Sequence, residues 1–253
     1  MKLENKVAIV TGASRGIGKA IALALAEERA NVVVVARSET EGRLPGTIHK
    51  TVEEIRALGG NALAVKTDVT KEDEVNEMVQ KTLDYYGRIN VLVNNTGLGR
   101  QSGVGLPTTF MEISIEMWDL VVAVNLRSAF LCSKAVLPFM VKQRSGSIIN
   151  VSSVMTYTPS GVTKAVIDRL TAALAREVKE YNIAVNALCP DYTLTESFKV
   201  LSHDMGRSQW QKPEMWGRYA AFLACQDASS LTGKYLIAEE LEKLISESVQ
   251  KAP

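Results

Sequence analysis

Histidine and cysteine are scarce in this chain of 253 residues, and their scarcity restricts the chemistry that it can perform. Only two histidines are present, His49 and His203, so neither a histidine-based metal site nor a Ser-His-Asp triad is expected. The three cysteines, Cys132, Cys189 and Cys225, are far apart in apolar stretches. We expect buried, reduced thiols in a reducing compartment and predict no bound metal.

The chain also lacks an excess of charge of either sign and a long apolar run. Its 29 Lys and Arg against 28 Asp and Glu give a net charge of +1, so no overall basic field attracts nucleic acid or an anionic membrane. No apolar run approaches the roughly 20 residues that cross a bilayer, and residues 1–6 lack a signal-peptide core. We therefore expect a cytoplasmic protein with neither a nucleic-acid nor a membrane partner.

Short β-branched runs alternate with segments of 3.6-residue apolar periodicity along the whole chain. The run of four valines at 32–35 indicates a strand buried on both faces, which is typical of parallel sheets covered by helices. The sequence predicts a single α/β domain over 1–253, with a doubly wound, mostly parallel, Rossmann-like sheet. Its seven expected strands are residues 6–10, 32–36, 62–67, 90–94, 147–151, 184–189 and 234–237.

Two segments interrupt this alternation, residues 38–50 and residues 196–212. The second is polar, contains Met205, and follows the carboxyl end of the sixth strand. Because ligands of open α/β sheets bind outside the carboxyl ends of the strands, we predict a substrate lid at about 196–213.

A glycine-rich turn, Thr-Gly-Ala-Ser-Arg-Gly-Ile-Gly at 11–18, follows the first strand and opens a helix expected to run to about Arg29. Glycines permit the tight turn, and the free N–H groups of the helix N-terminus favour a pyrophosphate. The alternative is a turn of purely structural use. The predicted dinucleotide contacts here are Gly12, Ser14, Arg15, Gly16, Ile17 and Gly18.

The residue that ends the second strand distinguishes the two nicotinamide cofactors. NAD sites usually place a carboxylate there, whereas an arginine accommodates the 2′-phosphate of NADP. Here the strand ends with Arg37, and Arg15 supplies a second guanidinium from the glycine-rich turn. NADP(H) is therefore preferred, while NAD(H) stays possible because Glu39 or Glu41 can return to a ribose.

The glycine-rich turn resembles that of the short-chain dehydrogenase/reductase family, and further motifs match in the same order. Asp68 and Val69 resemble the family's adenine-contacting pair, and Asn-Asn-Thr-Gly at 94–97 is similar to its Asn-Asn-Ala-Gly. The resemblance implies that Asn95 and Gly97 border the adenosine ribose. It also implies an oxidoreductase that interconverts a carbonyl and a secondary alcohol by hydride transfer.

The resemblance implies roles for an asparagine and a serine in catalysis. Asn125 corresponds to the asparagine that holds a proton-relay water, and Ser153 to the serine that hydrogen-bonds the substrate carbonyl. On residue chemistry alone, Asn125 in the helical run 118–137 is either buried with partners or on an exposed stripe. Ser153 and its neighbour Ser152, which we expect to be structural, are alternatively turn or helix caps.

Residues 189–195, Cys-Pro-Asp-Tyr-Thr-Leu-Thr, are similar to the family's Pro-Gly segment beside the nicotinamide. By resemblance, Pro190 walls the nicotinamide, Thr193 presents its backbone to the carboxamide, and Thr195 presents its hydroxyl to phosphate. Asp191 replaces the glycine, so we expect it to adopt a strained, glycine-like φ.

The chain departs from the family at the Tyr-x-x-x-Lys signature. Residues 160–164 read Ser-Gly-Val-Thr-Lys, which places Lys164 as the lysine that holds the nicotinamide ribose and Ser160 at the tyrosine's position. The preceding loop is several residues shorter than in relatives. An aliphatic hydroxyl is a far weaker acid than a phenol, so we expect the proton to come from Tyr157 or from water.

Tyr157 is the candidate replacement. Thr158 is expected to cap the helix with Pro159 in its first turn, which leaves Tyr157 in the short loop beside Ser153. Its hydroxyl either swings to the vacant position or stays in solvent while the ring packs on the loop.

Taken together, these residues predict an NADP(H)-preferring oxidoreductase that acts on a small carbonyl or alcohol and forms a homo-oligomer, a dimer or tetramer. The substrate is expected to be uncharged or weakly polar, because Met205, Trp210, Met215 and Trp216 lie in or near the lid, although these side chains are alternatively core. Two further readings stay open: an NADP(H)-binding protein without turnover, and a shortened chain whose nicotinamide pocket never orders.

Overall fold

A computed structural model of the chain describes residues 3–99, 109–154, 157–201 and 210–250. Within them, seven strands form one sheet in the order β3-β2-β1-β4-β5-β6-β7, and every neighbouring pair is parallel. The predicted α/β class is confirmed, and each strand bound lies within one residue of its prediction. The strands are β1 (Val7–Thr11), β2 (Asn31–Ala36), β3 (Ala62–Lys66), β4 (Val91–Asn94), β5 (Gly146–Val151), β6 (Ile183–Leu188) and β7 (Tyr235–Leu236).

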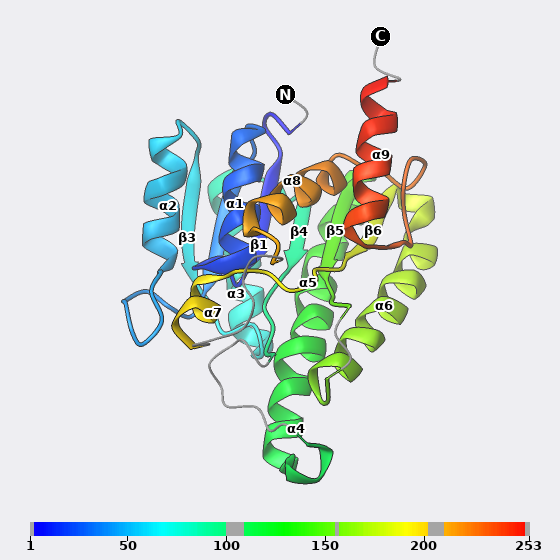
Figure 1. The fold of residues 1–253 in the computed structure, drawn as a ribbon. Coiled ribbons are helices and arrows are strands. Elements are labelled where there is room, and N and C mark those ends of the chain that lie inside the picture. The colour runs from blue at the N-terminus through cyan, green and yellow to red at the C-terminus, as the bar shows by residue number, and fades with distance from the viewer. Residues whose placement is uncertain (1–2, 100–108, 155–156, 202–209, 251–253) are drawn as a thin grey trace.

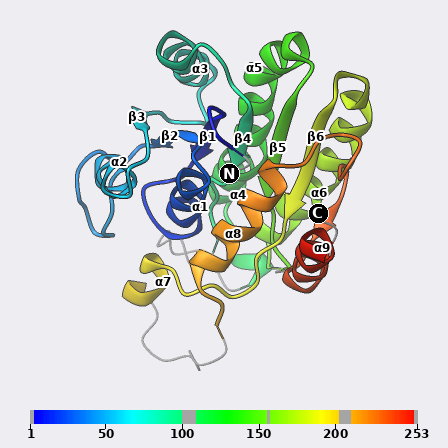
Figure 2. The same cartoon turned by 90° about the horizontal axis from the view of Figure 1, so that it is seen from above.

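Helices cover both faces of the sheet (Figures 1 and 2). Side chains of β1 alternate between the two sides: Ala8 and Val10 join the core under one helical layer, and Val7 and Ile9 join the other. This alternation follows from the two-residue period of a strand. The first layer holds α1 (Gly16–Glu27), α2 (Ile48–Ala57), α8 (Pro213–Ala224) and α9 (Ala238–Gln250), and the second holds α3 (Glu72–Tyr86), α5 (Ser128–Gln143) and α6 (Ser160–Glu177).

The helical run expected at 118–137 begins earlier and is not uniform. It comprises α4 (Ile115–Val122), a π-helical turn (Ala123–Arg127) and α5. By length and composition, the stretch Ile115–Gln143 is long and apolar enough to cross a membrane. The prediction that no apolar run approaches the length that crosses a bilayer was therefore wrong. Half of its most apolar window is buried, and α5 packs on the sheet, which is the behaviour of a core helix.

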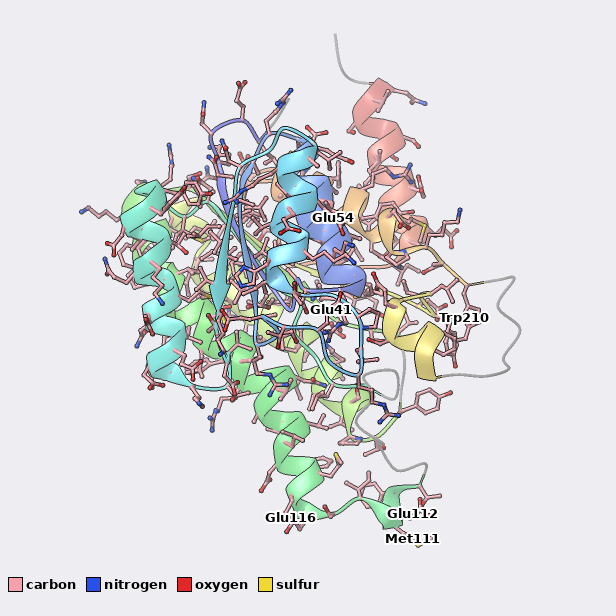
Figure 3. All side chains as sticks on the ribbon, turned by 90° about the vertical axis from the view of Figure 1, so that its left-hand side faces the viewer. Glu41, Glu54, Met111, Glu112, Glu116 and Trp210 are labelled. Atoms are coloured by element: carbon pink, nitrogen blue, oxygen red, sulfur yellow. The ribbon has the colours of Figure 1, made fainter. Side chains whose placement is uncertain are left out.

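The remaining elements are short. A 3-10 turn (Phe110–Glu112) precedes α4, and Met111 and Glu112 project at the far end of the molecule in Figure 3. A second 3-10 turn (Lys179–Tyr181) follows α6, and α7 (Glu196–Leu201) follows β6. Residues 38–47 form the loop before α2, so only the end of the expected irregular segment 38–50 is helical.

All three thiols are free, but they are not equally buried. Cys132 and Cys189 are buried as expected, whereas Cys225 is only half-buried at the end of α8. Because the strands are parallel, their carboxyl ends share one edge of the sheet, and in Figure 1 they point towards α7 and α4. The loops that follow β1, β4, β5 and β6 therefore meet at this edge.

Candidate functional site

The turn between β1 and α1 depends on glycine at several positions. Gly12 and Gly16 have φ of +67° and +59°, in the left-handed region that favours glycine. A Cβ on Gly18 would lie 2.3 Å from Asn95 Nδ2 and 2.4 Å from the Gly12 carbonyl oxygen. The backbone of this turn is therefore packed directly against the loop after β4.

The N-terminus of α1 already holds an anionic group. The Gly16 amide donates a hydrogen bond of 2.7 Å to Oε2 of Glu196, the first residue of α7, and no side chain caps the helix from Arg15. The carboxylate is a stand-in for a phosphate oxygen at the position where the helix dipole and the free N–H groups favour negative charge. The turn thus fits the pyrophosphate of a dinucleotide.

A cavity of about 340 Å³ opens beside this turn and brings together most of the predicted cofactor contacts. It also reaches Ser38 after β2, Thr67 after β3, and Leu44 in the loop before α2. The predicted contacts that line it are Gly12, Ser14, Arg15, Gly16, Ile17, Gly18, Arg37, Asp68, Val69, Asn95, Gly97 and Thr195. Lys164, Pro190 and Thr193 lie outside its lining.

The two arginines at the adenosine end differ in their surroundings. Arg15 donates from Nε to the Pro45 carbonyl at 2.8 Å and from Nη2 to the Gly46 carbonyl at 2.9 Å, so it also holds the loop before α2. Burial lowers the pKa of Arg15, and the nearby carboxylate of Glu196 opposes that shift. Arg37 is exposed at the cavity wall.

Neither carboxylate that was considered for a ribose lines this cavity. Glu39 lies 2.9 Å from Lys66 Nζ and 3.6 Å from His49 Nε2, and its hydrogen bond with Lys66 lowers the pKa of Glu39. Glu41, labelled in Figure 3, lies 3.9 Å from Lys50 Nζ. Both carboxylates therefore have basic partners outside the site.

The loop after β4 fastens the glycine-rich turn to the sheet. Asn95 donates from Nδ2 to the Thr11 carbonyl at 2.9 Å, and its amide donates to Thr11 Oγ1 at 3.0 Å. Asn94 donates to Asn150 Oδ1 at 2.9 Å, which joins β4 to β5. At the end of β3, Asp68 accepts hydrogen bonds from Thr70. Burial raises the pKa of Asp68, but these bonds outweigh it and the pKa is lowered.

Asn125 is buried with partners, which decides between the two alternatives for this residue. It lies in the π-helical turn, 2% exposed. Its Oδ1 accepts from the Leu98 amide at 2.6 Å, and its Nδ2 donates to Thr163 Oγ1 at 2.9 Å. The asparagine thus ties the loop after β4 to the first turns of α6.

Lys164 is buried in α6 beside the same loop. Its Nζ donates to the Val151 carbonyl at the end of β5, at 2.6 Å. Burial lowers the pKa of Lys164 to about 8, and the carboxylate of Asp168, one helical turn later, partly opposes this. A Cβ on Gly97 would lie 3.3 Å from Lys164 Nζ and 3.5 Å from Asn125 Oδ1, so both side chains face one backbone position at the cavity wall.

Ser153 and Pro190 join the loops after β5 and β6. Ser153 Oγ donates to the Pro190 carbonyl at 3.5 Å, and the Val154 amide donates to the same carbonyl at 3.3 Å. Ser152 donates to the Lys164 carbonyl at 3.2 Å, a contact between β5 and α6. Ser153 is half-buried and Ser152 is buried.

The expectation for Asp191 was wrong. Among the described residues other than glycine, positive φ occurs only at Asn5, Arg29, Arg144 and Asn182, so Asp191 does not take a glycine-like conformation. Its exposed side chain instead accepts a hydrogen bond from the amide of Tyr192 at 2.7 Å. The turn therefore holds an aspartate without left-handed strain.

The two threonines after Pro190 have separate surroundings. Thr193 is buried, and its Oγ1 accepts from Trp216 Nε1 at 3.0 Å. Thr195 turns its methyl group towards Gly16, while its Oγ1 accepts from the Phe198 amide at 3.4 Å. Thr193 therefore joins this segment to the core, and Thr195 lies at the cofactor cavity.

The start of α6 differs from its prediction. The helix begins at Ser160, and Pro159 occupies the N-cap position without a side-chain cap, so Thr158 does not cap it. Ser160 Oγ lies 3.6 Å from the place that a Cβ on Gly99 would take, beside the loop after β4.

The Tyr157 side chain is 40% exposed, and its hydroxyl lies 3.2 Å from the Tyr192 hydroxyl. Our sequence reasoning did not assign Tyr192.

Of the four apolar residues expected near the substrate, Met205 lies outside the described residues. Trp216 is fully buried in the core, and Met215 packs against that core. Trp210 contacts the rings of Tyr192 and Phe198, with centroids 4.8 Å and 3.9 Å away. Of the expected lid, α7 and residues 210–213 are described, and its role stays a prediction.

Comparison with known proteins gives a consistent result. Residues 6–206 match the family model described as short chain dehydrogenase. The chain is 38% identical to 3-oxoacyl-(acyl-carrier-protein) reductase of Synechocystis sp., over 92% of this chain and 94% of that protein. It is 34% identical to glucose 1-dehydrogenase 2 of Bacillus subtilis, over 94% of each.

The solved structures agree in fold. The crystal structure of hydroxysteroid dehydrogenase from Escherichia coli has a TM-score of 0.81 at 30% identity, covering 93% of this chain and 95% of that one. The family match and these relatives span the glycine-rich turn, the sheet and the loops at its carboxyl edge. The chain therefore belongs to the short chain dehydrogenase family and is an NAD(P)(H)-dependent oxidoreductase that interconverts a carbonyl and a secondary alcohol.

Proposed function

We propose that this enzyme is an NADP(H)-preferring reductase of uncharged or weakly polar carbonyl compounds, with Asn125, Ser153, Lys164 and Tyr157 at its active site. The observation that carries the proposal is the position of Gly97. This glycine lines the dinucleotide cavity, and it also faces the buried ends of Lys164 and Asn125. The cofactor cavity and two of the side chains proposed for catalysis, Lys164 and Asn125, therefore meet at one wall.

The preference for NADP(H) is supported by the charges around the adenosine end. Arg15 and Arg37 line the cavity, and guanidinium groups suit a phosphate monoester. Glu39 and Glu41, the carboxylates that would favour a free ribose, lie against lysines instead. NAD(H) is the second cofactor to test.

NADPH supplies the hydride when it is bound, and the protein supplies position and a proton. At neutral pH the Lys164 ammonium, held by the Val151 carbonyl, is suited to orient a ribose hydroxyl. The hydroxyl of Ser153 polarises the substrate carbonyl. Asn125 fixes the loop after β4 against α6. Pro190 and Thr193 complete the nicotinamide side, and Thr195 the phosphate side.

The proton donor is the part in which this chain differs from the family signature. Ser160 occupies the signature position, and an aliphatic hydroxyl is a much poorer acid than a phenol with its pKa of about 10. Tyr157 is one helical turn earlier, and its carbonyl accepts from the Gly161 amide at 2.5 Å. We assign proton donation to the Tyr157 hydroxyl.

The substrate class is supported by the rings of Tyr192, Phe198 and Trp210, which pack together beside Tyr157. The relatives named above act on an acyl group carried by a protein, a sugar and, by name, a steroid. These names share an oxygen function on an otherwise diverse skeleton, so we propose the carbonyl class and no single compound.

We also propose that the chain forms a homo-oligomer, a dimer or tetramer, in the cytoplasm. The support is the surface of α4, α5 and α6, which exposes the apolar side chains Leu120, Phe130, Val162 and Val166, each 41–50% exposed. A surface of this kind on α4, α5 and α6 suits a second copy of the chain.

The test is a titration with NADPH and with NADH, followed by reduction of a panel of carbonyl compounds. The unmodified protein, Tyr157→Phe and Ser160→Tyr are compared. We expect NADPH to bind more tightly than NADH and turnover to fall about 10²- to 10⁴-fold in Tyr157→Phe. Tight binding without turnover, together with a gain in Ser160→Tyr, would instead identify a silent NADP(H)-binding protein.

A further inference from the structure

The loops after β5 and β6 are joined side by side at the active-site edge of the sheet. The Ser152 amide donates to the Leu188 carbonyl at 2.8 Å, and the Pro190 carbonyl accepts from Val154 and Ser153. These bonds bring the segment that carries Tyr157 against the segment that carries Tyr192. The two phenol oxygens lie 3.2 Å apart, within hydrogen-bond distance.

Tyr192 is the more firmly held of the two phenols. Its carbonyl accepts from the Gln211 amide at 2.9 Å, and its ring contacts Trp210, which in turn contacts Phe198. Figure 3 shows Trp210 beside α7. Tyr192 is half-buried, whereas Tyr157 is 40% exposed on the shortened loop before α6. The bond to Tyr192 therefore helps to fix the location of the Tyr157 hydroxyl.

We propose that Tyr192 is a positioning residue for Tyr157, which holds the Tyr157 hydroxyl in place and resupplies its proton. The inference rests on the proposed function. In reduction, hydride adds to the carbonyl carbon, the C=O π bond becomes an alkoxide, and the alkoxide takes the proton of Tyr157. The Tyr157 phenolate takes the proton of Tyr192, which regains one from water. A hydroxyl that donates to a phenolate is a charge-assisted hydrogen bond, so it also stabilises the developing charge.

Tyr192→Phe tests the proposal because it removes one oxygen and keeps the ring that contacts Trp210. Tyr85→Phe, on a tyrosine that is 64% exposed on α3, is the matched control for loss of a phenol oxygen. We expect Tyr192→Phe to lower kcat about tenfold, the scale of one well-placed hydrogen bond, with KM and the Kd for NADPH unchanged. Tyr85→Phe should leave all three values unchanged.

The double variant separates an action through Tyr157 from an independent one. If Tyr192 acts through Tyr157, the pair Tyr157→Phe and Tyr192→Phe together should be no slower than Tyr157→Phe alone. The solvent isotope effect on kcat in the unmodified protein should also change in Tyr192→Phe, which a merely structural contact would not alter.

Three results would overturn the proposal. An unchanged kcat in Tyr192→Phe would do so, as would a tenfold loss that persists in the Tyr157→Phe background. A rise in KM alone would assign Tyr192 to substrate binding. If the unmodified protein binds NADPH but reduces none of the carbonyl compounds, the proposed function fails and this inference with it, whereas turnover that is indifferent to Tyr192 refutes the inference alone.

Discussion

At the residue scale, Lys164 is the one charged side chain among the four residues proposed for catalysis, and it is buried. It is an ammonium group inside the protein, with the Val151 carbonyl as acceptor and Asp168 one turn away. Burial disfavours the charged form and lowers the pKa of Lys164 to about 8. Its charge therefore changes close to the pH at which enzymes are assayed.

We predict that kcat/KM for carbonyl reduction falls as the pH rises through about 8, because the Lys164 ammonium is then lost. Lys164→Arg is the comparison, since a guanidinium stays charged above pH 12. That variant is expected to be slower but to lose the descending limb near pH 8. Initial rates from pH 6 to 10 decide this, and a limb that persists in Lys164→Arg would assign it to another group.

The same pKa predicts how stability depends on pH. Because the folded-state pKa of Lys164 lies below the unfolded value near 10.4, the unfolded chain binds more protons between about pH 8 and 10. The contribution of Lys164 to the free energy of unfolding therefore increases with pH in that window. Below about pH 8 the cost of burying the Lys164 ammonium is present in full. Urea unfolding of the unmodified protein and of Lys164→Arg should diverge there, and parallel curves would contradict the assignment.

Gly18 gives a prediction about packing. In Gly18→Ala the new methyl group would lie 2.3 Å from Asn95 Nδ2 and 2.4 Å from a backbone carbonyl, so the turn must shift. We expect the free energy of unfolding to fall by about 1–3 kcal/mol and the affinity for NADPH to fall with it. Gly42→Ala is the control, because a Cβ there has nothing within 4 Å. Equal urea midpoints for the two variants would refute the close approach.

At the scale of elements, one hydrogen bond between α1 and α7 lies where the cofactor is expected to bind. The N-terminus of α1 binds the Glu196 carboxylate at 2.7 Å, in the place where a pyrophosphate oxygen is expected. A dinucleotide must displace this carboxylate to reach the same amide. The measured affinity for the cofactor therefore depends on how much more strongly this helix N-terminus binds the pyrophosphate than it binds the Glu196 carboxylate.

We predict that Glu196→Gln binds NADPH about three- to tenfold more tightly than the unmodified protein, because the competing negative charge is removed. Glu214→Gln is the matched control, since Glu214 lies on α8 in a groove that Gly16 and Glu196 also line, and the Gly16 amide donates to Glu196. Titration followed by NADPH fluorescence measures both. Weaker binding in Glu196→Gln would show that Glu196 supports the site.

The elements were predictable from sequence because their signals are local. Four consecutive valines gave β2, and the glycine-rich turn after β1 gave the helix that follows it. The π-helical turn at Ala123–Arg127 was not predictable from local residues, because the partners of its Asn125, Leu98 and Thr163, lie 27 and 38 positions away. The cap predicted at Thr158 failed because the chain enters α6 one residue later.

At the scale of the whole molecule, the sequence predicted which loops form the site, because parallel strands bring their carboxyl ends to one edge of the sheet. That rule placed the loops after β1, β4, β5 and β6 at one edge. It does not say which side chains touch across the edge: the contacts of Gly16 with Glu196 and of Tyr157 with Tyr192 join residues 180 and 35 positions apart. Such pairs depend on the packed loops and not on their sequence spacing.

The exposed apolar surface of α4, α5 and α6 predicts an oligomer that a single charge can weaken. We expect Phe130→Glu to shift the mass in solution from a multiple of 27.6 kDa towards 27.6 kDa, as measured by light scattering after size exclusion. Leu58→Glu, at an exposed apolar residue beyond the end of α2, should leave the mass unchanged. A monomeric unmodified protein would contradict the prediction.

The packing of α8 against α1 has a consequence for how the protein is made. A Cβ on Gly217 would lie 2.5 Å from the Ala20 carbonyl, so these helices, nearly 200 residues apart in sequence, meet backbone to backbone. Until the ribosome has released α8, the side of α1 that faces α8 has no cover, although the sheet and α2 already cover its other side. A nascent chain therefore carries this side of its first helix exposed through most of translation, and that side is where a chaperone would bind it.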